Sequence, residues 1–235
     1  MKQLTKKDLE TPRSTDLLLS WVMTKIEEFA TSDEGKSAIR KREGLCKELI
    51  EEVLPVAIFG HYYFKPNCGV LIQPVIGNQN YDAVILRDGE HCTELKYLEV
   101  TQAHEGEPEY LRMLALDRDG HVPVLGDVKK SGTKATGIKI EVENVAKGCE
   151  EVVASELGRI EVALRRKSDK TYPSDCGLIV VFDDYISMRH GDDKAKLRDL
   201  VQRLLPELSV FRLVSAVGWS ARTFIACENP TYSIK

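Results

Sequence analysis

The sequence lacks any long apolar run. No stretch approaches the ~18 consecutive apolar residues that a membrane-spanning helix needs. The beginning of the chain, MKQLTKKDLETPRSTD, also lacks the apolar centre of a signal peptide. These absences argue against a membrane protein and predict a cytoplasmic location.

Clustered cysteines are absent as well. The six cysteines are scattered singly, with no Cys-x-x-Cys pair and no closely spaced Cys/His pair. A structural zinc site is therefore not expected, because such sites bring four ligands together from short spacings. We expect reduced thiols, most of them buried, at Cys46, Cys68, Cys92, Cys149, Cys176 and Cys227.

An excess of positive charge is also missing. The chain has 33 Lys and Arg against 37 Asp and Glu, which gives a net charge of -4. Indiscriminate coating of nucleic acid depends on neutralising phosphates, so this balance argues against such a function. It leaves room for a local basic cleft.

The residues that are present predict a single domain over 1–235. With 235 residues, 43% of them hydrophobic, the chain can bury a sizeable core. Apolar residues at helical spacing predict a peripheral helix over 14–30 within the first 34 residues, a second helix over 35–54 stopped by Pro55, a long helix over 142–167 and another over DDKAKLRDLVQRLLPEL.

Strand patterns predict the sheet. Four strands are expected at 56–64, 70–76, 83–86 and 97–101, with the Asp-Gly turn of RDGE (87–90) joining a hairpin. The segment 105–140 is expected to be an insertion or edge hairpin. The run GLIVVFDDY after the long helix is typical of a crossover into a sheet buried on both faces. The fold class is therefore α/β, with a mixed central sheet flanked by helices, a core over 36–185 and a C-terminal helix and strands over 186–235.

Two carboxylates interrupt the hairpin strands. In NQNYDAVILRDGEHCTELKYLEVTQAH, Asp82 opens one strand and Glu99 lies late in the returning strand, so an antiparallel hairpin brings both to the same end. Solvent-facing residues on a hairpin are the alternative interpretation. A competing pair, Glu94 and Lys96 in ELK, lies at the turn end, and the odd five-residue step puts Glu94 on the opposite face from Glu99.

The helix, three strands, crossover helix and strand resemble the αβββαβ core of the PD-(D/E)xK nuclease-like superfamily, the restriction-endonuclease-like fold. The matching residues are Glu52 in ELIEEVLP, with Glu48 one turn earlier as its substitute, Asp82 in NYDAVIL and Glu99 in YLEVTQ. The resemblance implies Mg²⁺ or Mn²⁺ held by Asp82, Glu99 and the backbone carbonyl of Val100, and cleavage of DNA. Since family nucleases are often dimers, it also admits a homodimer.

The sequence departs from the family pattern at the lysine. Thr101 stands where the motif has its lysine, so Thr101 and Gln102 are expected near the attacking water, with Lys147 or His104 as replacement candidates. The basic segment with Arg165, Arg166, Lys167 and Lys170 is interpreted as complementing the negative end of a helix dipole, with phosphate contact as the alternative. Two other functions stay open: a catalytically inactive binding or assembly module of the same fold, and an unrelated α/β interaction protein.

Overall fold

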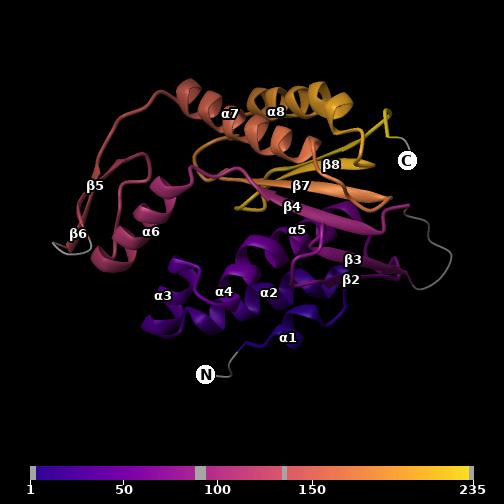
Figure 1. Cartoon of the computed structure of the whole chain (residues 1–235), viewed down its shortest axis with the longest axis horizontal. Helices are drawn as coiled ribbons and strands as arrows, with labels where there is room; N and C mark the ends of the chain where they lie inside the picture. Colours follow the sequence, from indigo (N-terminus) through magenta and orange to yellow (C-terminus); the bar gives the residue numbers. More distant parts are fainter. Residues whose placement is uncertain (1–3, 88–93, 134–136, 233–235) are drawn as a thin grey trace.

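A seven-stranded mixed sheet forms the centre of the protein in our computed structural model, which describes residues 4–87, 94–133 and 137–232 (Figure 1). The strands follow the spatial order β1, β2, β3, β4, β7, β8, β9. Their bounds are Arg13–Ser14, Val70–Pro74, Ala83–Arg87, Tyr97–Gln102, Cys176–Phe182, Leu213–Gly218 and Phe224–Glu228.

The direction of the strands changes across the sheet. β1 to β4 pair antiparallel, β4, β7 and β8 pair parallel, and β9 returns antiparallel to β8. The predicted strands at 70–76, 83–86 and 97–101 are confirmed, as are the two C-terminal strands. Most of the predicted RDGE turn lies outside the described residues. The fold class is thus α/β, with the mixed, helix-flanked sheet that the sequence predicts.

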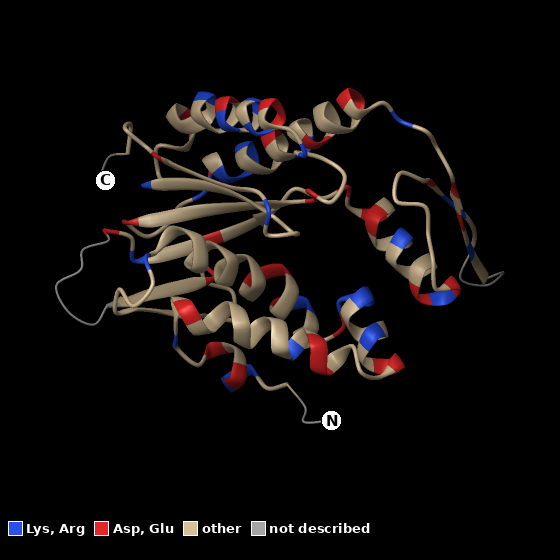
Figure 2. Ribbon diagram, turned by 180° about the vertical axis from the view of Figure 1, so that it is seen from behind, with Lys and Arg blue, Asp and Glu red and all other residues tan. Residues whose placement is uncertain are grey.

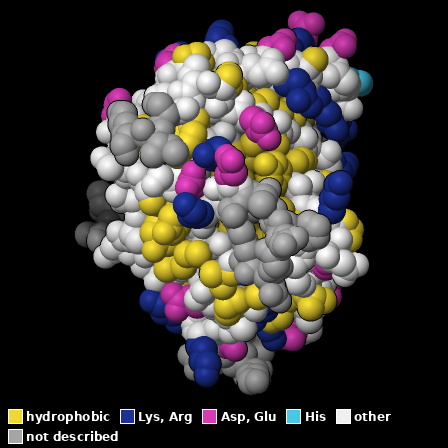
Figure 3. Space-filling model, turned by 90° about the vertical axis from the view of Figure 1, so that its right-hand side faces the viewer, with side chains coloured by type: hydrophobic (Ala, Val, Ile, Leu, Met, Phe, Trp, Pro, Cys, Tyr) yellow, Lys and Arg dark blue, Asp and Glu magenta, His cyan; other side chains and the backbone are white. Residues whose placement is uncertain are grey.

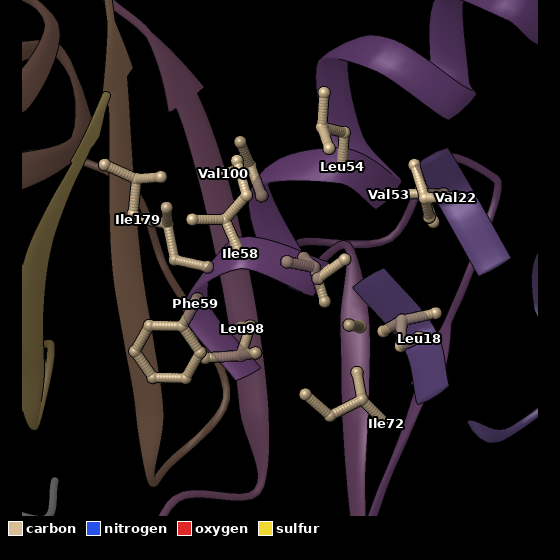
Figure 4. Packing of buried hydrophobic residues seen from close by; sticks show 14 of the residues in the cluster. Leu18, Val22, Val53, Leu54, Ile58, Phe59, Ile72, Leu98, Val100 and Ile179 are labelled. Atoms are coloured by element: carbon tan, nitrogen blue, oxygen red, sulfur yellow. The ribbon is translucent and has the colours of Figure 1, made fainter. Parts of the chain in front are cut away.

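One face of the sheet is covered by helices from the N-terminal part of the chain. α5 (Leu54–Tyr63) lies on the sheet, and α2 (Thr15–Phe29) packs outside it with Leu18 and Val22 fully buried. Figure 4 shows Leu18 of α2 near Ile72, whereas Ile58 and Phe59 of α5 lie near Leu98 and Ile179 of two further strands. Three shorter helices, α1, α3 and α4, complete this side at Lys6–Glu10, Asp33–Lys41 and Leu45–Glu48.

The other face carries α7 (Cys149–Ser168) and α8 (Gly191–Leu204), the latter followed by a 3-10 turn at Leu205–Leu208. Every residue of β7 is buried, as expected for a strand covered on both faces. α7 is the predicted crossover helix. Its predicted start at Val142 is wrong, because β6 extends to Glu143 and the helix begins only after Gly148.

The segment between β4 and α7 stands apart from the main sheet (Figure 1). It contains α6 (Glu107–Asp119) and a separate antiparallel pair, β5 (Asp127–Thr133) with β6 (Gly137–Glu143). We call this segment, α6 with β5 and β6, the arm. Asp117 of α6 joins the arm to α3 by contacting Ser37 at 3.0 Å and Lys41 at 2.9 Å.

The predicted strand at 56–64 is wrong, since these residues belong to α5. The seven residues Leu54–Gly60 are all buried, and a short, uniformly apolar run has no period that separates a buried strand from a buried helix. Pro55 does not stop the preceding helix either. It lies in the first turn of α5, where a proline needs no hydrogen-bond acceptor.

A π-helical turn, Leu49–Val53, joins α4 to α5. The Leu54 N–H donates to the Leu49 carbonyl, one residue further back than in an α-helix. Pro55 has no N–H to donate to the carbonyl of Glu51, four residues before it. The Gln102 side chain of β4 donates to that carbonyl instead, with Nε2 at 2.5 Å from the oxygen. This bond ties the turn that carries Glu52 to the sheet.

Replacing Gln102 by Met should therefore destabilise the fold, because Met keeps the length of the side chain and removes its donor. We expect a loss of about 1–2 kcal/mol in the free energy of unfolding, measured by urea denaturation. The matched control is Gln73→Met, at a half-buried glutamine of β2 that makes no side-chain hydrogen bond among the described residues. Equal effects of the two substitutions would contradict this role of Gln102.

Candidate functional site

Asp82 lies just before β3, at the point where β4 extends beyond its neighbour. The β3–β4 pairing ends at Ala83 opposite Leu98, and the Asp82 N–H donates to the Leu98 carbonyl at 2.7 Å. The next amide of β4 that faces β3 belongs to Val100. This amide has no backbone acceptor in β3. It donates to Oδ2 of Asp82 at 2.6 Å. The end of β3 thus fixes the Asp82 carboxylate against the edge of β4.

Glu99 lies between these two β4 residues in sequence and points toward α7. Its Oε1 accepts from Nζ of Lys167 at 2.5 Å, and the two side chains are only 11% and 12% exposed. Charges this deeply buried are stable only when they are paired. The pair therefore anchors the C-terminal turn of α7 to the third residue of β4.

Glu52 approaches Asp82 from the opposite face of the sheet, on the π-helical turn. Burial raises the pKa of the Glu52 carboxyl to about 7, and the negative charges of Asp82 and Glu48 add to the rise. Burial likewise raises the pKa of Asp82 to about 7, with Glu99 adding to the shift, while the Val100 amide and Lys167 oppose it. The cluster therefore holds more negative charge than its neighbours neutralise.

The donor set fits a hard divalent cation. Asp82 and Glu99 interact electrostatically at the edge of β4, and the Val100 carbonyl points to the same side as its N–H, toward Asp82. Mg²⁺ takes one or two carboxylates and completes its octahedron with water and substrate oxygens. Within the described residues, no three His, Cys, Asp or Glu side chains converge as a complete metal cage.

Thr101 and Gln102 lie on opposite faces of β4. Thr101 is buried and shares the face of Glu99, and its Oγ1 accepts from Nη2 of Arg166 at 3.2 Å. Gln102 faces the other way and is held by the Glu51 carbonyl. The alternation of the strand therefore separates the two residues that the sequence expects together near a water molecule.

The structure places the replacement candidates for the lysine elsewhere. Lys147 precedes α7 and pairs with Asp127 of the arm at 3.6 Å. His104 is exposed, and its Nδ1 accepts from the Gly106 N–H at 2.9 Å.

The competing ELK pair is engaged in other contacts as well. Glu94 contacts Arg212, and Lys96 binds Asp175 at 2.7 Å. Neither of these partners belongs to the Asp82–Glu99 cluster.

Lys167 is the residue that sequence reasoning missed, because a lysine at a helix end is ordinarily solvated. The predicted topology could have indicated the position of Lys167. A crossover helix between parallel strands runs opposite to them, so its C-terminal turn returns to the level where the strands begin. Lys167 is the second-last residue of α7, and Glu99 is the third residue of β4. Lys147 precedes the other end of the helix and had to lie far from Glu99.

Charge elsewhere on the surface is mixed. Basic and acidic residues alternate along α7 and α8 (Figure 2). On the face shown in Figure 3, charged side chains of both signs lie side by side among hydrophobic ones. No helix in the described part of the chain is long and apolar enough to cross a bilayer. The described cysteines form no disulfides, and Cys46, Cys176 and Cys227 are buried.

Comparisons with known proteins give no function for this chain, so the interpretation depends on the residues of the site. No protein-family model, curated protein or solved structure matches the chain.

Asp82→Asn should change stability in a pH-dependent way. A carboxyl whose folded pKa is raised from near 4 to about 7 favours folding when it is protonated, so its contribution is lost as pH rises from about 4 through 7. The amide keeps an acceptor for the Val100 N–H and removes the charge. We expect urea denaturation to find Asp82→Asn more stable than the wild type by about 1–3 kcal/mol at pH 8 and nearly equal at about pH 4.

The control for this comparison is Glu27→Gln, on the exposed face of α2. It should leave the pH profile unchanged. If Asp82→Asn is less stable than the wild type at pH 8, other groups in the folded protein neutralise the negative charge of the Asp82 carboxylate.

Proposed function

We propose that the protein is a metal-dependent nuclease-like enzyme that acts on DNA phosphodiesters, with Lys167 in the role of the motif lysine. The contact between Lys167 and Glu99, beside Asp82, carries this proposal. It supplies a cation next to the two acidic residues of the motif, where Thr101 supplies none.

The order of the elements supports the same proposal. The element order starts with the helical segment whose π-helical turn carries Glu52. Three antiparallel strands (β2, β3 and β4), the crossover helix α7 and the parallel strand β7 then follow, as in the αβββαβ core that the sequence resembles. The arm enters between β4 and α7 without interrupting the sheet.

Asp82, Glu99 and the Val100 carbonyl would hold Mg²⁺ or Mn²⁺. When bound, the ion would lower the pKa of a water ligand and offset the negative charge that develops on the phosphate. The chain's own contribution is orientation: the Val100 amide fixes Asp82, and Lys167 fixes Glu99.

Glu52 and Lys167 have complementary tasks in this proposal. The pKa of Glu52, raised to about 7 by burial, suits a group that accepts a proton from the attacking water near neutral pH. The Lys167 ammonium places a fixed positive charge at the opposite side of the cluster, where it can stabilise the charge on a phosphate oxygen. The net charge of -4 implies that DNA would be bound through local cations rather than by the whole surface.

A lysine exchange tests the proposal directly. Lys167→Met should reduce Mg²⁺- or Mn²⁺-dependent DNA cleavage about a hundredfold, or roughly 3 kcal/mol, as for the loss of one preorganised donor. Thr101→Lys in that background should restore most of the activity, because residue 101 shares the face of Glu99. Thr101→Lys alone should give no gain, since the cation is already present.

The control is Lys170→Met, which removes an exposed lysine just beyond α7. It should leave cleavage unchanged. If Lys167→Met cleaves as well as the wild type, or if the wild type cleaves no DNA substrate while binding Mn²⁺, this role of Lys167 is wrong.

A catalytically inactive module of the same fold is the second candidate. The observation in its favour is the Lys167–Glu99 ion pair, which partly neutralises one of the two proposed metal ligands. Calorimetry with Mn²⁺ separates the candidates, because an inactive module has no need to bind metal.

For the enzyme, we expect Mn²⁺ affinity to rise about tenfold from pH 6 to pH 8, since binding displaces a proton from a carboxyl of pKa about 7. Asp82→Ala and Glu99→Ala should each abolish the heat signal, whereas Glu27→Gln should retain it. Wild-type protein that gives no signal at pH 8 would favour the inactive module.

A further inference from the structure

The last residues of β4 have one edge without a neighbouring strand. The β3–β4 pairing ends with Ala83 opposite Leu98, whereas β4 continues to Gln102. Backbone groups of successive residues point alternately to the two edges of a strand, so those of Leu98, Val100 and Gln102 point to the β3 side. The bonds from Asp82 to the Leu98 carbonyl and from Val100 to Asp82 agree with this direction. Beyond Asp82, the N–H and carbonyl of Gln102 therefore face an edge that β3 does not cover.

Arg166 of α7 reaches this open edge. Its Nη2 donates to the Gln102 carbonyl at 3.3 Å and to Oγ1 of Thr101 at 3.2 Å. The guanidinium therefore lies at the same edge of β4 as the Asp82 carboxylate. Gln102 is two residues beyond Val100, which places it about 7 Å further along the strand. Arg166 is exposed, so a ligand can reach it.

The charge of Arg166 is the uncompensated one among the arginines of α7. Arg159 and Arg165 each pair with two glutamates. Both acceptors of Arg166 are neutral, and no carboxylate in the described part of the chain forms an ion pair with it. Its Nε and Nη1 have no hydrogen-bond partner among the described residues either. A guanidinium that is held through one nitrogen keeps the others for an anion, and its fork matches the oxygens of a phosphate.

A groove with a volume of about 420 Å³ lies beside the guanidinium, between α7 and the end of β4. Ala103 and His104 line one side, and Ser155 and Gly158 of α7 line the other. His104 adds a donor, because its Nδ1 accepts from a backbone N–H and its neutral ring then carries the hydrogen on Nε2. None of the described residues that line the groove is acidic. The groove therefore suits an anionic strand that leaves the proposed metal site in the direction of β4.

We propose that Arg166 and the Gln102 N–H bind the phosphate next to the scissile one on the same DNA strand, and that the groove receives the strand beyond it. This inference rests on the proposed function, which places the scissile phosphate at Asp82 and Glu99. It adds a requirement for the substrate. The enzyme acts on a bond within a polynucleotide chain that has a charged phosphate beside it, so Arg166 is a binding residue for the substrate strand.

Single methylphosphonate linkages test this contact, because each removes the charge of one phosphate. In a DNA substrate whose cleavage site has been mapped with Mn²⁺, the linkage on each side of the scissile bond is replaced in turn. A linkage several nucleotides away serves as the control. For the wild type, one of the two neighbouring replacements should lower kcat/KM about tenfold, the loss expected for one charge-assisted hydrogen bond. The distant replacement should have little effect.

Variants assign the contact to Arg166. Arg166→Met should lower kcat/KM on the unmodified DNA about tenfold and lose the response to the replacement, so that it equals the wild type on the modified DNA. A variant that is merely destabilised would keep the wild-type response. Arg166→Lys should retain part of the response because it retains the charge. Arg165→Met, at the neighbouring arginine that pairs with two glutamates, should behave as the wild type.

Two results would overturn the inference and leave the proposed function standing. One is a wild type that cleaves equally well after either neighbouring replacement. The other is an Arg166→Met protein that keeps the full response. A wild type that cleaves no DNA with Mn²⁺ would instead contradict the proposed function, and this inference with it.

Discussion

The parallel pairing of β4 with β7 determines how the residues of the candidate site come together. Parallel neighbours cannot be joined by a tight turn, so the chain must cross from the end of β4 back to the start of β7. α7 makes that return and therefore runs opposite to both strands. Its C-terminal turn meets the beginning of β4 through Lys167 and Glu99, and its first half meets the strand ends through Glu156. One helix thus makes polar contacts at both ends of the parallel strands.

The carboxylates of the candidate site differ in how their buried charge is compensated. Glu99 and Lys167 neutralise each other, so their burial is compensated by a short ion pair. Asp82 and Glu52 receive no comparable cation, and their raised pKa values record the cost of holding negative charge together. Such uncompensated pairs cluster at functional sites, since a ligand of opposite charge relieves the cost only when it binds. The fold without a ligand therefore carries this electrostatic cost, and Asp82 is at its centre because it interacts with both Glu52 and Glu99.

Sequence reasoning found the hairpin because both of its strands have clear patterns and pair with their neighbours in sequence. Asp82 and Glu99 followed from that hairpin, since a strand end fixes the position of the next residue. The prediction was wrong over 54–63. The run Leu54–Gly60 is uniformly buried and has no helical or strand periodicity, and the proline in the first turn of α5 is easily mistaken for the end of a helix. The π-helical turn was equally hidden, because it depends on a hydrogen bond from Gln102, about fifty residues away in sequence. Lys167 depends on the direction of α7 rather than on any local spacing.

The position of the Lys167 ammonium group also explains why residue 101 can be a threonine. Its hydroxyl lies on the face of Glu99 and accepts from Arg166, the neighbour of Lys167 in the last turn of α7. A lysine at 101 would place a third cation beside Arg166 and Lys167 in a buried setting, where like charges repel strongly. A neutral acceptor instead satisfies Arg166 and leaves Glu99 to Lys167. In the proposed function the helix supplies the lysine, so a neutral residue at position 101 is its expected partner, and the two positions should vary together.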